Sequence, residues 1–240
     1  MKKYLTPVAF FACLILCVSG AWALETPVNF DRWPDGGAER NLDDILDSLY
    51  GWGNLERIDD AVDTHWVLAN TGGPNALDGG AIAQAKYAGF GETFGYWAGG
   101  TFHDLFSIAP GSGNNFDNGI GLNPTVLDGT IDEAIVGSGP FELGLDPSGT
   151  NMVWSSDPTK NDKRKGQFLD HMVTYRIVGG ANNEIGNYVV AWEDLPILGD
   201  HDYNDVVIEL SGVRPTPEPG TVILMGLGLL GLGILQLRRK

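Results

Sequence analysis

The chain has 240 residues, a formal net charge of −16, 34 glycines and 19% charged residues. A surface this acidic repels phosphate backbones, which proteins bind through clustered lysine and arginine, so nucleic acid is excluded as a partner. The glycine content predicts many turns and few helices, and the length suits a single all-β domain. Because Cys13 and Cys17 both lie near the N-terminus, no disulfide framework is expected in the rest of the chain.

The N-terminus has the layout of a secretory signal peptide. Two lysines precede an apolar run over residues 8–18, and Ala21 and Ala23 provide a small-x-small cleavage site. The sequence therefore predicts a signal peptide over residues 1–23, which signal peptidase removes after Ala23. An uncut signal anchor is the alternative, although the run is short for a membrane span.

Residues 24–212 are expected to form one domain that opens with a short helix. Asn41 can cap a helix over residues 42–50, where apolar side chains recur at helical spacing and Gly51 supplies the end. The acid-rich stretch that follows, residues 55–63, is interpreted as a solvated turn, with a second cation site as the alternative.

Short runs of strand-forming residues, separated by Gly, Pro, Asn or Asp, occupy the rest of this domain. The expected strands cover residues 64–69, 81–88, 92–97, 131–136, 141–145, 152–155, 171–178, 188–192 and 206–210. The run at 188–192 is apolar throughout, which is typical of a strand buried on both faces. Many short strands without long helical periods predict a single β-sandwich or jelly roll.

Six side chains with oxygen atoms crowd the connection between the last two expected strands. They are Glu193, Asp194, Asp200, Asp202, Asn204 and Asp205. Like charges so close in sequence repel one another unless a cation neutralises them. Calcium takes about 6–8 oxygen ligands, which carboxylates, an amide and backbone carbonyls can supply. We interpret the six as calcium ligands; the alternative is that some of them only cap turns or accept backbone hydrogen bonds.

Other chemistries fit this segment less well. The run from Asp200 begins like an EF-hand loop, but its sixth position is Asp205 instead of glycine and its twelfth is Ser211 instead of glutamate. Zinc is disfavoured because the domain has no cysteine and His201 stands alone among carboxylates. Tyr203 is expected to be a core residue. No GxSxG hydrolase motif, HExxH metalloprotease motif or Walker loop occurs, so an enzyme is not expected.

The C-terminus combines a proline-rich stretch with an apolar tail. Residues 213–220 are predicted to be a linker that cannot continue a strand, because prolines interrupt it. The apolar run over 221–237 is just long enough for a helix to span a thin bilayer, and two arginines and a lysine follow it. The terminal cations are expected to stay cytoplasmic. A plain membrane anchor is one interpretation of this tail.

The same tail resembles the PEP-CTERM sorting signal of exosortase substrates. The resemblance lies in Pro217, Glu218 and Pro219, the glycine-rich apolar stretch and the basic end at residue 240. It implies that an exosortase, a membrane protease-transpeptidase, cuts near these three residues. It further implies transient anchoring in the inner membrane through residues 221–237, followed by delivery to the cell surface or an exopolysaccharide matrix.

The acidic segment resembles the C-terminal signature of the DUF4114 family. An aromatic-Glu-Asp-Leu strand end is followed by a Gly-Asp-x-Asp-Tyr-Asn-Asp turn and an apolar strand, within about residues 170–212. The resemblance implies a secreted, adhesin-like protein whose acids bind calcium. We therefore expect a calcium-stabilised surface or matrix protein with a structural or adhesive role. The alternatives are a glycan-binding module, in which some of the seven tryptophans and seven tyrosines stack on sugars, and, less favoured, a glycan-active hydrolase.

Overall fold

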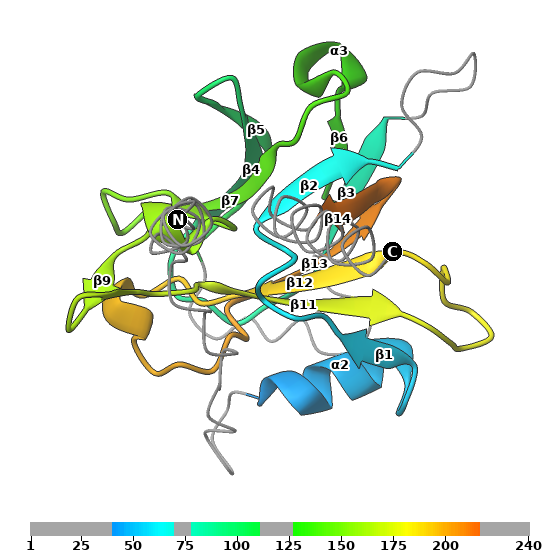
Figure 1. Ribbon diagram of the computed structural model, residues 1–240. Helices are drawn as coiled ribbons and strands as arrows, with labels where there is room; N and C mark the ends of the chain where they lie inside the picture. Colours follow the sequence, from blue (N-terminus) through cyan, green and yellow to red (C-terminus); the bar gives the residue numbers. More distant parts are fainter. Residues whose placement is uncertain (1–39, 70–77, 111–126, 217–240) are drawn as a thin grey trace, which may run out of the picture.

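The computed structural model describes residues 40–69, 78–110 and 127–216, which form two antiparallel sheets and a covering helix (Figure 1). The larger sheet has the strand order β1 (Leu55–Arg57), β11 (Met172–Ile177), β12 (Tyr188–Trp192), β13 (Val206–Ser211), β3 (Gly79–Lys86) and β6 (Asp128–Ile131). The smaller sheet has the order β5 (Thr101–Ile108), β4 (Glu92–Ala98), β7 (Glu142–Pro147) and β8 (Trp154–Ser155). Two further pairs are β14 (Val213–Thr216) with β2 (His65–Leu68), and β10 (Gln167–Phe168) with β9 (Lys163–Arg164).

The main core lies between the two sheets, as expected of a sandwich. It is rich in aromatic side chains, and Trp66, Trp154 and Trp192 are fully buried in it. These three residues come from β2, β8 and β12, so the core joins segments far apart in the sequence. The all-β class predicted from the glycine content and the short strands is confirmed.

A helix covers the outer face of the six-stranded sheet. The helix α2 (Leu42–Tyr50) buries its apolar side against β11, β12 and β13 and appears beside β1 in Figure 1. Its bounds match the prediction, since the Asn41 side chain accepts a hydrogen bond from the Asp44 amide at 2.9 Å and Gly51 ends it with φ of 84°. Covered by α2 on one face and by the sandwich core on the other, β12 is buried on both sides, as its apolar run predicted.

One strand prediction was wrong, and one long strand was missed. The strand expected over residues 131–136 ends at Ile131, and residues Glu133–Val136 form the short helix α3. Asp132 causes the change, because its side chain accepts a hydrogen bond from the Ala134 amide at 2.7 Å and so caps a helical turn. The strand β5 was not predicted, although it pairs with β4 along its whole length.

The first four residues of the linker predicted over 213–220 form a strand. Val213–Thr216 form the strand β14, in which Pro215 lies opposite Trp66 of β2. The amide and carbonyl of Trp66 bond instead to Phe141, at 2.8 and 2.9 Å. The Trp66–Pro215 position therefore needs no N–H from the proline, which is why a proline is tolerated in this strand.

Two of the four acids in the turn predicted to be solvated, residues 55–63, are buried. Asp60 and Asp63 are only 2% and 1% exposed, and Asp60 forms an ion pair with Arg57 of β1. The interpretation as a solvated turn is therefore wrong for these two acids.

The signal peptide predicted over residues 1–23 and the sorting residues Pro217, Glu218 and Pro219 lie outside the described residues. The apolar run 221–237 lies outside them as well. Within residues 40–69, 78–110 and 127–216 no helix is both long and apolar enough to cross a membrane.

Candidate functional site

The acidic segment is the connection between two neighbouring antiparallel strands. The ladder of β12 and β13 ends at the pair Trp192–Val206, so Glu193 and Asp205 occupy the next positions on the two strands. Beyond β3, the amides of Tyr87 and Ala88 donate to the Asp205 carbonyl at 2.9 and 3.3 Å. The chain thus brings both ends of the connection together where β12 ends and β13 begins, at one end of the central strands of the six-stranded sheet.

The predicted ligands converge in two overlapping groups. Ligand oxygens of Glu193, Asp200 and Asp202 lie within 4.8 Å of one another, and so do those of Glu193, Asp194 and Asp205. Glu193 belongs to both groups. Of the six predicted residues, Asp200 is exposed and the other five are buried. Asn204 joins the first group, because its Nδ2 donates to Asp202 Oδ2 at 2.8 Å.

Backbone amides hold several of these carboxylates in place. Glu193 accepts from the Leu195 amide through Oε1 and from the Asp202 amide through Oε2, both at 3.2 Å. Asp205 Oδ2 accepts from the Asp194 amide at 2.7 Å. These contacts are of the kind expected if the acids only accept backbone hydrogen bonds. Each oxygen still has a further lone pair that can bind another ligand.

Two buried oxygens of the cluster accept no hydrogen bond. They are Asp194 Oδ2 and Asn204 Oδ1, on residues that are 2% and 0% exposed. Buried polar atoms are nearly always paired, because leaving one unpaired costs about 1–3 kcal/mol. Both atoms are hard oxygen donors, which suits a calcium-type cation and does not suit zinc.

Burial and mutual repulsion raise the pKa values of the acids. Burial, followed by the charges of Asp200 and Asp202, raises the pKa of Glu193 to about 8. The pKa of Asp205 is raised well above its usual range by burial and by the charges of Asp194 and Glu193, and burial also raises that of Asp194. A bound cation would offset this repulsion and favour the ionised forms.

The loop that carries these acids has an unusual backbone. Ile197, Leu198, His201 and Tyr203 all have positive φ, between 55° and 63°. Such conformations cost about 1–3 kcal/mol each in residues other than glycine and persist only where the surroundings impose them. Tyr203 provides one such restraint, because it is fully buried and its hydroxyl donates to the Asp170 carbonyl at 2.5 Å. The prediction that it is a core residue is confirmed.

Two residues that were not predicted as part of the site, His171 and Trp154, contact the backbone of its acids. The His171 ring stacks on Trp154 with centroids 3.9 Å apart, and its Nδ1 lies 2.8 Å from the Glu193 carbonyl. Trp154 Nε1 donates to the Asp194 carbonyl at 2.8 Å. Trp154 belongs to the smaller sheet, so both sheets fix the backbone of the two leading acids. In the sequence, the one hint of such a role was the position of His171 at the start of the strand expected over residues 171–178.

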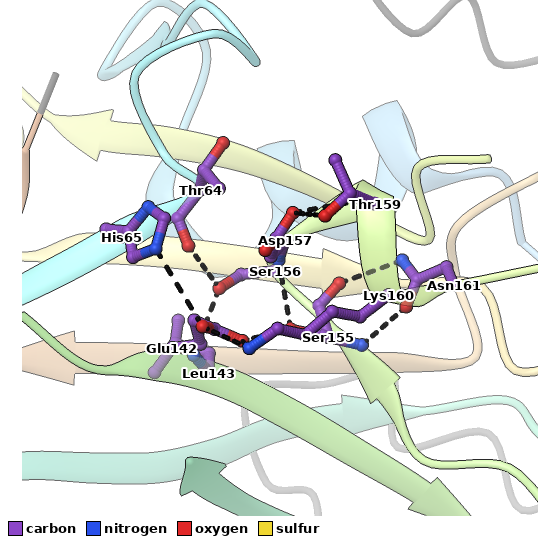
Figure 2. A network of polar contacts seen from close by, with 10 residues as sticks. All are labelled: Thr64, His65, Glu142, Leu143, Ser155, Ser156, Asp157, Thr159, Lys160 and Asn161. Carbon is purple, nitrogen blue, oxygen red and sulfur yellow. Dashed lines mark hydrogen bonds and ion pairs between the residues drawn. The ribbon is translucent and has the colours of Figure 1, made fainter. Parts of the chain in front are cut away.

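A third group of possible ligands lies apart from the loop. His65, Glu142 and Asp157 have ligand atoms within 4.8 Å of one another (Figure 2). Here Glu142 is already neutralised, since Lys160 Nζ lies 2.5 and 2.7 Å from its two carboxylate oxygens. Ser155 Oγ also donates to Glu142 at 2.8 Å. We interpret this group as a polar bridge that ties β7 to β8 and to the short helix η1 (Pro158–Lys160).

Two family models match the chain. The model described as Domain of unknown function (DUF4114) matches residues 121–213. The model of the PEP-CTERM protein-sorting motif matches residues 215–240. The first match begins well before residue 170, where the sequence signature was recognised, and it contains all six predicted ligands. A comparison with curated protein sequences finds no match.

Among solved structures, two bacterial lectins are similar to the chain. The Chromobacterium violaceum lectin CV2L, in complex with alpha-methyl-fucoside, is 18% identical with a TM-score of 0.35, and the match covers 62% of this chain and 94% of that one. The Ralstonia solanacearum high-affinity mannose-binding lectin is 17% identical with a TM-score of 0.34, over 61% and 93% of the two chains.

Proposed function

This chain carries a DUF4114 domain and a PEP-CTERM sorting motif, and from that premise we propose that it is a calcium-stabilised surface or matrix protein. Its role is structural or adhesive and does not involve catalysis. The motif implies export and sorting by an exosortase, which is the processing partner. Signal peptidase removes residues 1–23, and cleavage occurs near Pro217, Glu218 and Pro219. The tail over residues 221–237 holds the protein in the inner membrane until then, after which it reaches the surface or an exopolysaccharide matrix.

The observation that carries the calcium proposal is the convergence of buried acids around oxygens without donors. Glu193, Asp194, Asp202 and Asp205 are buried together, and Asp194 Oδ2 and Asn204 Oδ1 accept no hydrogen bond. A folded state of this kind gains free energy when a divalent cation binds, because the ion neutralises the acids and fills the unused acceptor positions. Calcium is available outside the cytoplasm and tolerates irregular loop geometry.

The proposal predicts that calcium stabilises the full-length protein in detergent. At a calcium concentration about a hundredfold above Kd, binding to the native state adds about 2.7 kcal/mol. For a chain of this size, about 2–4 °C of Tm correspond to each kcal/mol, so we expect Tm to rise by about 5–10 °C. Asp200→Ala combined with Asp202→Ala removes two ligands of the loop, and Tm of this variant responds less to calcium.

A charge-matched control separates loss of the site from loss of negative charge. Asp128→Ala with Glu184→Ala also removes two acids, both exposed and outside the connection. This control should respond to calcium as the wild type does. A wild-type Tm that is the same in calcium and in EDTA contradicts the calcium proposal.

Glycan binding is the second candidate, and one side chain favours it. Trp52 is 87% exposed in the turn after α2, whereas most of the other described tryptophans lie in the core. An exposed indole offers a flat apolar face on which a sugar ring can stack.

The glycan candidate predicts that Trp52→Ala abolishes retention of the protein on immobilised exopolysaccharide while leaving Tm unchanged. Tm should be unaffected because the exposed side chain contributes little to folding. If the wild-type protein is retained neither on exopolysaccharide nor on a glycan array, glycan binding is contradicted and the structural role is the remaining candidate.

A further inference from the structure

A buried glutamate from the opposite sheet faces the acidic cluster. Glu92 is the first residue of β4 and pairs with Ile108 and Pro147 in the four-stranded sheet. It is 1% exposed, and neither of its carboxylate oxygens accepts a hydrogen bond from a donor. It lies outside the residues matched by the family model, which begin at 121.

The charge that acts most strongly on Glu92 is that of Asp194, one of the loop acids. Beyond the effect of burial, Asp194 raises the pKa of Glu92 through its charge and by accepting a hydrogen bond from the protonated Glu92 carboxyl group, so the two acids from opposite sheets are in contact. Asp194 Oδ2 also has no donor. Two oxygens of Glu92 and one of Asp194 therefore meet in the interior, and no amide, hydroxyl or ammonium group of the described residues donates to them.

The positive charge available nearby does not balance these acids. Among the described residues, the charge that opposes Glu92 comes from Lys86, which also acts on Asp194 and Asp205. The Lys86 ammonium is itself buried and donates to the Ala88 carbonyl at 2.5 Å. The single positive charge of Lys86 thus opposes the negative charges of three buried carboxylates, Glu92, Asp194 and Asp205. Burying an ionised carboxylate without a partner is among the most costly events in folding, so such a group either holds a proton or binds a cation.

We propose that Glu92, Asp194 and Asp205 hold a second divalent cation of the calcium type, the inner ion. Glu193 would be shared between this inner ion and the ion bound by the loop, the loop ion. The inference rests on the proposed function, which supplies the loop ion. Its geometric basis is the second ligand group, in which ligand oxygens of Glu193, Asp194 and Asp205 lie within 4.8 Å of one another, together with the contact between Asp194 and the buried Glu92. The loop position uses Glu193, Asp200 and Asp202.

The inner ion would have a role that the loop ion lacks. Glu92 belongs to the smaller sheet, whereas the other ligands belong to the β12–β13 connection of the larger sheet. A cation between them would link the two layers of the sandwich, as a disulfide does in other exported domains. The chain outside residues 1–23 has no cysteine to form such a link.

The inference is tested by counting the calcium ions bound to the full-length protein in detergent, by equilibrium dialysis and native mass spectrometry. We expect two ions on the wild type. Glu92→Gln keeps the size of the side chain but removes its charge, and it should retain one ion, with the inner position weakened at least about tenfold. In EDTA this variant should melt at or above the wild-type temperature, because an uncompensated buried acid has been removed.

Glu142→Gln is the matched control. Glu142 is a buried glutamate on the neighbouring strand β7, but Lys160 already neutralises it, so this variant should keep both ions. Asp200→Asn with Asp202→Asn should lose the loop ion.

The outcomes separate the two ideas. One ion on the wild type, or unchanged binding in Glu92→Gln, overturns the inner position and leaves the loop site intact. A wild type that binds no calcium contradicts the proposed function itself.

Discussion

Glu193→Gln is expected to abolish most of the stabilisation that calcium gives, because Glu193 is the residue common to both ligand groups. The substitution preserves the size of the side chain, and the remaining carbonyl oxygen can still accept from the Leu195 amide that bonds to Oε1. The expected rise of about 5–10 °C in Tm at a hundredfold excess of calcium should shrink to near zero. Calorimetry in calcium and in EDTA measures both states.

The control for this variant is a glutamate on the same pair of strands. Glu209 of β13 accepts hydrogen bonds from Tyr50, Gln84 and Asn187 and lies outside the acidic cluster. Glu209→Gln should lower Tm to the same extent in EDTA and in calcium, which leaves the calcium-dependent rise unchanged. If Glu193→Gln keeps the full rise, the convergence of the acids on Glu193 has no part in binding calcium.

Without calcium, stability is expected to fall as pH rises, the reverse of the usual effect of acidic groups. The pKa of Glu193 is raised from 4.5 to about 8 and that of Glu92 from 4.5 to about 10, in both cases by burial first. In the interval between each pair of values the folded state holds a proton that the unfolded state has lost. The free energy of unfolding therefore decreases with pH, by at most about 1.4 kcal/mol per pH unit for each group.

Calcium should reverse this dependence, because it binds the ionised carboxylates. Its effect on Tm is therefore expected to grow as pH increases from about 5 to about 9, where more of the acids have lost their protons. Melting curves across this range, in EDTA and in calcium, measure both trends. The combined variant Glu92→Gln with Glu193→Gln should have a flatter pH dependence in EDTA. A wild-type Tm that rises steadily with pH in EDTA contradicts the prediction.

Local signals in the sequence were sufficient where neighbours in the chain determine the structure. The helix 42–50 follows from a capping asparagine, apolar spacing and a terminal glycine, all within one short segment. The strand 188–192 follows from a continuous apolar run. The six predicted ligands could be named because they are crowded into one connection, and Glu193 and Asp205 meet simply because the strands on either side pair with one another.

Local signals failed where a single side chain or a distant partner determines the secondary structure or the burial of a residue. Asp132 changed an apolar run from strand to helix by capping it, and Pro215 entered a strand because Trp66 already bonds to Phe141 on its other side. Asp60 and Asp63 resemble surface acids in the sequence but are buried, Asp63 beside Thr174 of the six-stranded sheet. Neither the position of Trp66 nor that sheet can be known before the strands are placed.

The sequence by itself determined the all-β class, the acidic connection and the C-terminal sorting motif, because composition, local order and position along the chain encode them. Only the tertiary structure decided that Glu92 belongs beside that connection. It lies about a hundred residues from Asp194 in the chain, in the other sheet, and no pattern around it distinguishes it from thirty other acids. Its significance comes from burial without a hydrogen-bond donor, which exists only once the two sheets have packed.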